Sequence, residues 1–153
     1  MQGSIVGLFA AHQGGVPKPS VETLHIVENG CVGDKQNDTK HHGGPNRAVC
    51  LFSEEVLRLL QQENHPIFPG SVGENVLMSG VPWENVRPGT QLHFSDVILE
   101  ITSDAPPCRT IKESFEKGQF KRISAKINPH STRWYAKVIQ SGTVVTGESV
   151  TVN

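Results

Sequence analysis

Short stretches of apolar and β-branched residues, separated by turns, recur along the whole chain and constrain the fold most strongly. The 153 residues include 15 glycines and 10 prolines, and only 19% are charged. Strands are predicted at 3–10, 21–29, 47–52, 75–79, 90–94, 96–103, 132–139, 143–146 and 149–152. Many short strands at regular spacing with few helices are typical of a β-barrel. We therefore expect one mainly β domain over 1–153, a closed or partly closed barrel with a few short helices.

Helical patterns occupy only two parts of the sequence. A helix is predicted from its N-cap at Ser53 to about Asn64. Its apolar residues recur three and four positions apart, which gives one buried stripe. Residues 109–127 also have helical character, and Gly118 is expected to break it.

Charge and composition argue against several classes of partner. The formal net charge is −1, so neither a nucleic acid nor an anionic membrane is expected as a partner. The first apolar stretch has no basic leader and is predicted as a strand, and no stretch approaches the ~20 apolar residues that span a bilayer. Three widely spaced cysteines do not form a disulfide framework and suit a reducing compartment. These features predict a cytoplasmic protein.

Cys108 is the residue most suited to chemistry. Two prolines precede it and Arg109 follows it. A neighbouring cation lowers the pKa of a thiol and favours the thiolate, the form that binds metals or attacks electrophiles. The alternative is a buried, inert core cysteine, which is common for a free thiol. Of the other two cysteines, Cys50 lies in an apolar run and is expected in the core, whereas Cys31 borders a loop and is ambiguous.

The loop at 33–47 could hold an anion. Gly43 and Gly44 permit close backbone approach, so that successive N–H groups can surround a phosphate. Lys35 and Arg47 could add charge-assisted hydrogen bonds to it. The alternative is a solvated loop whose polar residues only stabilise turns.

Other polar residues of the two glycine-rich loops could recognise a heterocycle. Asp34 and Gln36 could accept hydrogen bonds from its donor edge. In the second loop, Gly73 precedes Glu74 and Asn75, and these two side chains could pair with a pterin or an amide edge. The alternative for the second loop is an ordinary turn that leads into a strand.

Four motifs, taken in order, resemble the MOSC family, which is named for the C-terminal domain of molybdenum-cofactor sulfurase. They are Gly-Asp-Lys-Gln at 33–36, His-Gly-Gly-Pro-Asn-Arg-Ala-Val at 42–49, Pro-Gly-Ser-Val-Gly-Glu-Asn-Val at 69–76, and Pro-Cys at 107–108. The resemblance covers nearly the whole chain and is closest to the small stand-alone bacterial members. It implies a barrel like the pyruvate-kinase insert domain. It also implies a bound molybdenum cofactor (molybdopterin), with Cys108 as the thiolate ligand of the metal.

The resemblance also implies an activity. Relatives reduce N-hydroxylated small molecules with electrons from a separate donor protein, and Cys108 would then be the catalytic metal ligand. The candidate cofactor-binding residues are Asp34, Lys35, Gln36, His42, Gly43, Gly44, Arg47, Gly73, Glu74, Asn75 and Arg109. Two alternatives stay open. One is a sulfur carrier that bears a persulfide on Cys108, loaded by a partner desulfurase, and the other is a non-catalytic interaction barrel.

Overall fold

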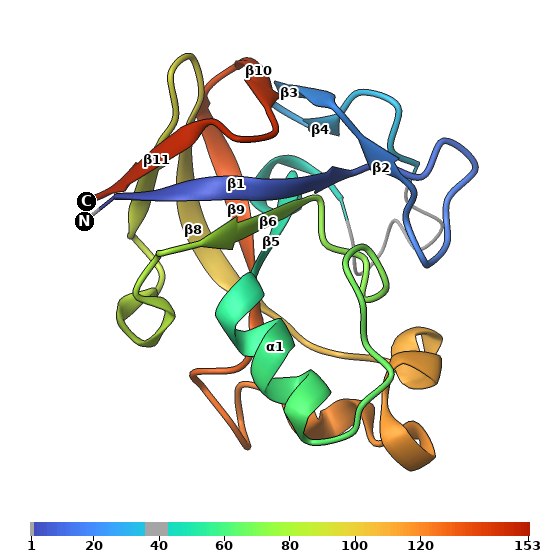
Figure 1. The fold of residues 1–153 in the computed structure, drawn as a ribbon. Coiled ribbons are helices and arrows are strands. Elements are labelled where there is room, and N and C mark those ends of the chain that lie inside the picture. Colours follow the sequence, from blue (N-terminus) through green and yellow to red (C-terminus); the bar gives the residue numbers. More distant parts are fainter. Residues whose placement is uncertain (1, 36–42) are drawn as a thin grey trace.

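A closed barrel of seven strands forms the centre of the molecule in the computed structural model, which describes residues 2–35 and 43–153 (Figure 1). Around the barrel the strands follow the order β11-β7-β8-β9-β5-β6-β1, and β1 pairs with β11 to close it. Their bounds are β1 Gln2–Phe9, β5 Val49–Ser53, β6 Val76–Ser79, β7 Gln91–His93, β8 Ile98–Ala105, β9 Arg133–Gln140 and β11 Ser149–Val152. The predicted mainly β barrel is thus confirmed.

Two further groups of strands extend the barrel. β2 (Ser20–Val21) pairs with the end of β1, and a separate sheet has the order β10-β3-β4, with β10 at Gly142–Val145, β3 at Thr23–Val27 and β4 at Gly30–Cys31. The single strand predicted at 21–29 is therefore two strands in different sheets. The chain leaves the edge of β1 after β2 and pairs with β10 instead, which a local pattern does not reveal.

Among the described strands, β5 and β6 form the only parallel pair. The helix α1 (Glu54–Gln62), the only α-helix in the described residues, joins them. Such a pair requires a crossover connection, and α1 supplies it. Ser53 is the N-cap, as predicted: its Oγ accepts a hydrogen bond from the backbone N–H of Val56 at 3.2 Å. The helix ends slightly before the predicted limit, because Asn64 has a left-handed backbone with φ of 72°.

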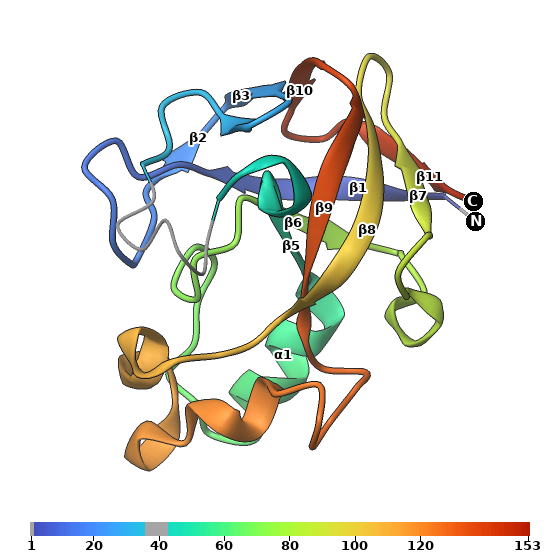
Figure 2. The same ribbon diagram turned by 180° about the vertical axis from the view of Figure 1, so that it is seen from behind.

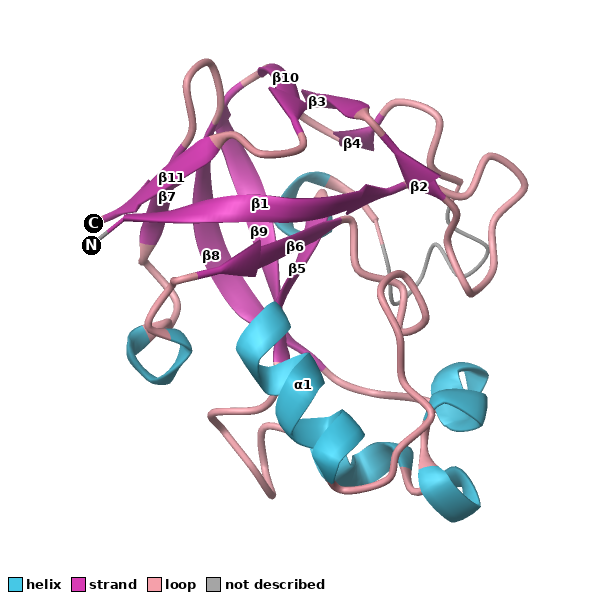
Figure 3. Cartoon of the chain, viewed as in Figure 1, coloured by secondary structure: helices cyan, strands magenta, loops and turns pink. Residues whose placement is uncertain are grey.

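The segment after β8, predicted to be helical over 109–127 with a break at Gly118, forms three short 3₁₀ helices (Figure 3). They are η3 Arg109–Ser114, η4 Glu116–Gly118 and η5 Phe120–Ile123, and two others are η1 Pro45–Arg47 and η2 Trp83–Asn85. The break at Gly118 is present, with φ of 66°. Figure 2 shows this segment and α1 at the same end of the barrel, where Arg122 donates two hydrogen bonds to Glu63. None of the helices in the described ranges is long and apolar enough to cross a membrane.

The candidate site lies beside β5, a buried strand near the centre of the fold. All five of its residues are buried, and it lies between β6 and β9. The continuous apolar run 49–52 fits a strand that is covered on both faces. The segments that enter or leave β5, β6, β8 and β9 therefore meet around it.

Candidate functional site

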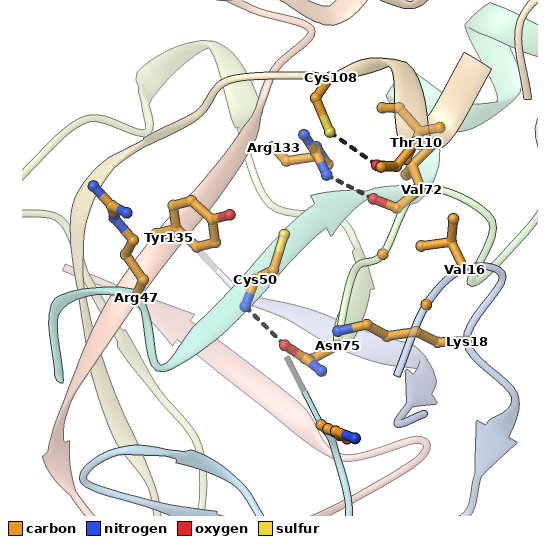
Figure 4. Close-up of a pocket in the computed structure, with 14 residues that line it drawn as sticks. Val16, Lys18, Arg47, Cys50, Val72, Asn75, Cys108, Thr110, Arg133 and Tyr135 are labelled. Carbon is orange, nitrogen blue, oxygen red and sulfur yellow. Dashed lines mark hydrogen bonds between the residues drawn. The ribbon is translucent and has the colours of Figure 1, made fainter. Parts of the chain in front are cut away.

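One cavity of about 150 Å³ lies where these segments meet (Figure 4). Its walls come from the connection after β1, the loop before η1, η1 itself, β5, the segment before β6, the segment after β8, and β9. The lining residues are Gly15, Val16, Lys18, Lys35, Arg47, Cys50, Val72, Gly73, Asn75, Cys108, Thr110, Ile111, Arg133 and Tyr135. Five candidates from the sequence motifs, Lys35, Arg47, Gly73, Asn75 and Cys108, thus lie along one cavity.

Cys108 is half-buried at the wall of the cavity and immediately precedes η3. Prolines at 106 and 107 have no backbone N–H and cannot extend the pairing of β8, which ends at Ala105. The Cys108 sulfur lies 2.8 Å from the hydroxyl oxygen of Thr110. The thiol is therefore held by a neighbouring side chain and still reaches the cavity.

Cys50 adds a second sulfur to the same cavity. It is only 6% exposed, as expected for a core residue, yet it lines the cavity from β5. Burial raises the pKa of its thiol, so this group is protonated at neutral pH. Cys31 is also buried but does not line the cavity, and its sulfur contacts the carbonyl oxygen of Ala48 at 3.8 Å. Burial, with a further contribution from the negative charge of Asp34, raises the pKa of Cys31 to about 12.

Arg133, at the start of β9, is the main residue that the sequence motifs did not reveal. Its side chain is buried, with 4% exposure, and its Nη1 donates to the carbonyl oxygen of Val72 at 2.6 Å. Its Nη2 donates to the carbonyl oxygens of Ala105 and Pro106 at 3.2 and 3.3 Å. The guanidinium therefore joins the segment before Cys108 to the glycine-rich segment before β6. Its Nε is buried and has no hydrogen-bond partner in residues 2–35 and 43–153.

A buried polar network supports the opposite wall. Asp34 accepts 2.8 Å hydrogen bonds from the Lys18 ammonium, the Asn75 side-chain amide and the backbone N–H of Ala11. The Lys18 and Asp34 side chains are only 6% and 2% exposed. The Asn75 amide also donates to the carbonyl oxygen of Phe9 and accepts from the N–H of Cys50. Lys18 was not predicted, because nothing in its local sequence marks it as the partner of Asp34.

The remaining candidates lie elsewhere. Glu74 is fully buried behind the cavity wall, where its carboxylate accepts a hydrogen bond from the N–H of Gly70 at 2.9 Å. Gly43 and Gly44 do not line the cavity, and Arg109 is exposed beside it. The candidates Gln36 and His42 lie outside the described residues.

Gly73 is required by its backbone conformation. Its φ of 81° is a left-handed value that residues with a Cβ rarely adopt. A Cβ at this position would meet the Val16 side chain at 3.4 Å, an ordinary contact, so the backbone angle and not lack of space requires glycine. The glycine therefore lets the backbone of the second loop line the cavity.

Two curated relatives match most of the chain. YflK of Bacillus subtilis is 24% identical over 135 residues, which are 87% of this chain and 60% of YflK. YiiM of Escherichia coli is 26% identical over 125 residues, which are 79% of this chain and 55% of YiiM. The chain therefore spans only somewhat more than half the length of these relatives.

A solved structure and a family model extend the comparison. YuaD of Bacillus subtilis superposes with a TM-score of 0.75 at 20% identity, over 99% of this chain and 96% of YuaD, which shows that the fold is shared. The model of the MOSC domain matches residues 38–151. Because that match covers most of the sequence and the barrel agrees with it, the chain belongs to the MOSC domain family.

Proposed function

We propose that this protein binds the molybdenum cofactor with the Cys108 sulfur as a ligand of the metal, and that it reduces N-hydroxylated small molecules. The MOSC family is associated with this cofactor. The observation that carries the proposal is the shared cavity, in which the half-buried thiol of Cys108 lies among the cationic side chains of Lys35, Arg47 and Arg133. A thiol among cations suits a ligand that combines a soft metal centre with negative charge.

The residues present fit such a group. Thiolate is the protein ligand that best suits a metal already bound by sulfur. Lys35 and Arg47 are our candidates for the phosphate, since charge-assisted hydrogen bonds hold phosphates firmly. The Nε of Arg133 has no hydrogen-bond partner in the described part of the chain, so one donor of this cation stays unused by the protein. A cavity of about 150 Å³ is smaller than pockets that enclose whole organic ligands, so it suits the metal-bearing end of the cofactor.

Each residue then has a defined task. Cys108 would hold the metal, and the Thr110 hydroxyl beside its sulfur limits the rotation of the thiol. Arg133 holds the segment before Cys108 against the Val72 carbonyl, so that the sulfur keeps its place relative to the opposite wall. Asp34 and Asn75 build that wall, with Asp34 tied to Lys18. The bound cofactor would supply the electrons that cleave an N–O bond, and a separate donor protein would replenish them.

Cys108→Ser is expected to lower the molybdenum content of protein purified without air from a cofactor-producing host by about tenfold or more, because it removes the proposed metal ligand. Molybdenum per chain is measured by plasma mass spectrometry and the pterin by fluorescence after oxidation. Cys31→Ser is the matched control, since Cys31 is a free thiol outside the cavity lining, and it should retain the wild-type content. Equal molybdenum in Cys108→Ser and wild type, or none in wild type, would overturn the proposal.

The half-exposed position of Cys108 also favours a second candidate, a sulfur carrier that bears a persulfide on this residue. The desulfurase that loads it would be the partner. Intact mass after incubation with a cysteine desulfurase and cysteine distinguishes the two functions, because the carrier gains one sulfur that Cys108→Ser does not. A barrel used only for protein interaction would show neither the metal nor the added sulfur.

A further inference from the structure

Two of the three cysteines share a single small cavity, although they are 58 positions apart in the sequence. Cys50 lies on β5, between β6 and β9, and Cys108 lies on the segment that follows β8. Figure 4 shows the Cys50 sulfur pointing from β5 toward the part of the cavity that holds Cys108 and the Arg133 guanidinium. Both residues line the same cavity of about 150 Å³, and a cysteine side chain changes direction by rotation about its Cα–Cβ bond.

The charge of the cavity also suits an anionic complex. Arg133 is 4% exposed, and within the described residues its guanidinium donates only to backbone carbonyl groups. It therefore places a positive charge beside the two thiols without a hydrogen-bonded carboxylate to offset it. Its Nε is buried and has no hydrogen-bond partner among the described residues, so the guanidinium keeps one donor that these contacts do not use.

We propose that Cys50 and Cys108 together form a two-sulfur site for one soft monovalent metal ion of the copper(I) type. Thiolates select such ions over harder ones. Binding releases one proton from each thiol, forms two metal–sulfur bonds and moves no electrons. The resulting bis-thiolate complex has a net charge of −1, and the Arg133 guanidinium offsets it.

Two cysteine sulfurs, without further ligands, suit a copper(I)-type ion better than most other metals. In residues 2–35 and 43–153, no group of three or more His, Cys, Asp and Glu side chains could hold a metal ion. Zinc normally takes three or four protein ligands, so two sulfurs do not make a zinc site. Two thiolates are the set that a two-coordinate soft ion requires. This site uses the cavity of the proposed function but requires no pterin.

The test uses the whole chain, purified without cofactor and without air. Copper(I) is titrated into it in competition with a coloured copper(I) chelator, and the bound ion is examined by X-ray absorption. One ion per chain with two sulfur neighbours is expected. Cys50→Ala and Cys108→Ala should each weaken binding by about 100-fold, because the remaining sulfur loses the effective concentration of its partner.

Controls separate the site from a general affinity for thiols. Cys31→Ala should bind copper(I) as the wild type does, since Cys31 lies outside the cavity lining. Cys50→Ser provides a less disruptive second variant, and circular dichroism shows whether each variant is folded. Unchanged affinity in both folded Cys50 variants, or one sulfur neighbour in wild type, would overturn the inference. Either result would leave the molybdenum measurement on Cys108→Ser unaffected, so the two proposals fail separately.

Discussion

Lys18→Met is expected to lower the free energy of unfolding by about 3–5 kcal/mol, because removing one partner of a buried ion pair leaves an uncompensated charge. The Lys18 ammonium lies 2.8 Å from the Asp34 carboxylate, and both side chains are almost fully buried. The change is measured by urea unfolding at neutral pH. The cavity wall formed by Asn75 depends on the same carboxylate, so molybdenum content should fall together with stability.

A double-mutant cycle tests whether the ion pair is the cause. Asp34→Asn should also destabilise the protein, since it leaves the Lys18 charge without its carboxylate. The combined variant should lose less than the sum of the two single changes, because neither charge is then left unpaired. Arg58→Met is the exposed control, since Arg58 pairs with Glu54 on the surface of α1 and its side chain is 68% exposed. Additive losses would mean that packing of the Lys18 side chain, and not the pairing of charges, sets the effect.

Local patterns in the sequence were sufficient for most of the elements. Alternating residues, the Ser53 cap and the Gly118 break are set by neighbours a few positions away, and each is present in the structure. The division of 21–29 was missed because it depends on β10, more than 100 residues later. The parallel pairing of β5 with β6 and the closure of β1 on β11 depend on distant partners in the same way.

The residues of the candidate site also fall into those that local sequence motifs reveal and those that depend on distant partners. The motifs pointed to Lys35, Arg47, Gly73, Asn75 and Cys108, and the structure places these five along one cavity. Short sequence motifs identify such residues because each loop carries several polar or glycine positions together.

Three contributors to the site were missed for a common reason. Lys18 lies in a proline-flanked loop, Arg133 begins an apolar strand, and Cys50 is one residue of a buried run. Each acquires its role only through a partner from a distant segment, such as Asp34 for Lys18 and the Val72 carbonyl for Arg133. The one local signal was a cation next to the apolar residues of β9, which is unusual for a buried strand.

Glu74→Gln is expected to remove a large part of the pH dependence of stability. Burial raises the pKa of Glu74 from 4.5 to about 7, against the opposing hydrogen bond from Gly70 and the charge of Arg133. Between these two values the unfolded chain releases its proton while the folded protein keeps it. At low pH the carboxyl is protonated in both states and does not reduce the free energy of unfolding. That free energy then falls as pH rises from about 4.5 through about 7. The loss amounts to about 3 kcal/mol at pH 8.

Unfolding by urea at pH 5, 6.5 and 8 measures this difference. The amide that replaces the carboxyl can still accept from the Gly70 N–H but does not ionise, so Glu74→Gln should gain stability relative to wild type as pH rises. Glu113→Gln makes the same substitution at an exposed position and should follow the wild-type profile. A constant difference between Glu74→Gln and wild type at all three values would mean that Glu74 keeps one protonation state over this range. In that case the buried carboxylate would be held ionised beside Arg133, and the cavity would contain less net positive charge for an anionic ligand than we infer.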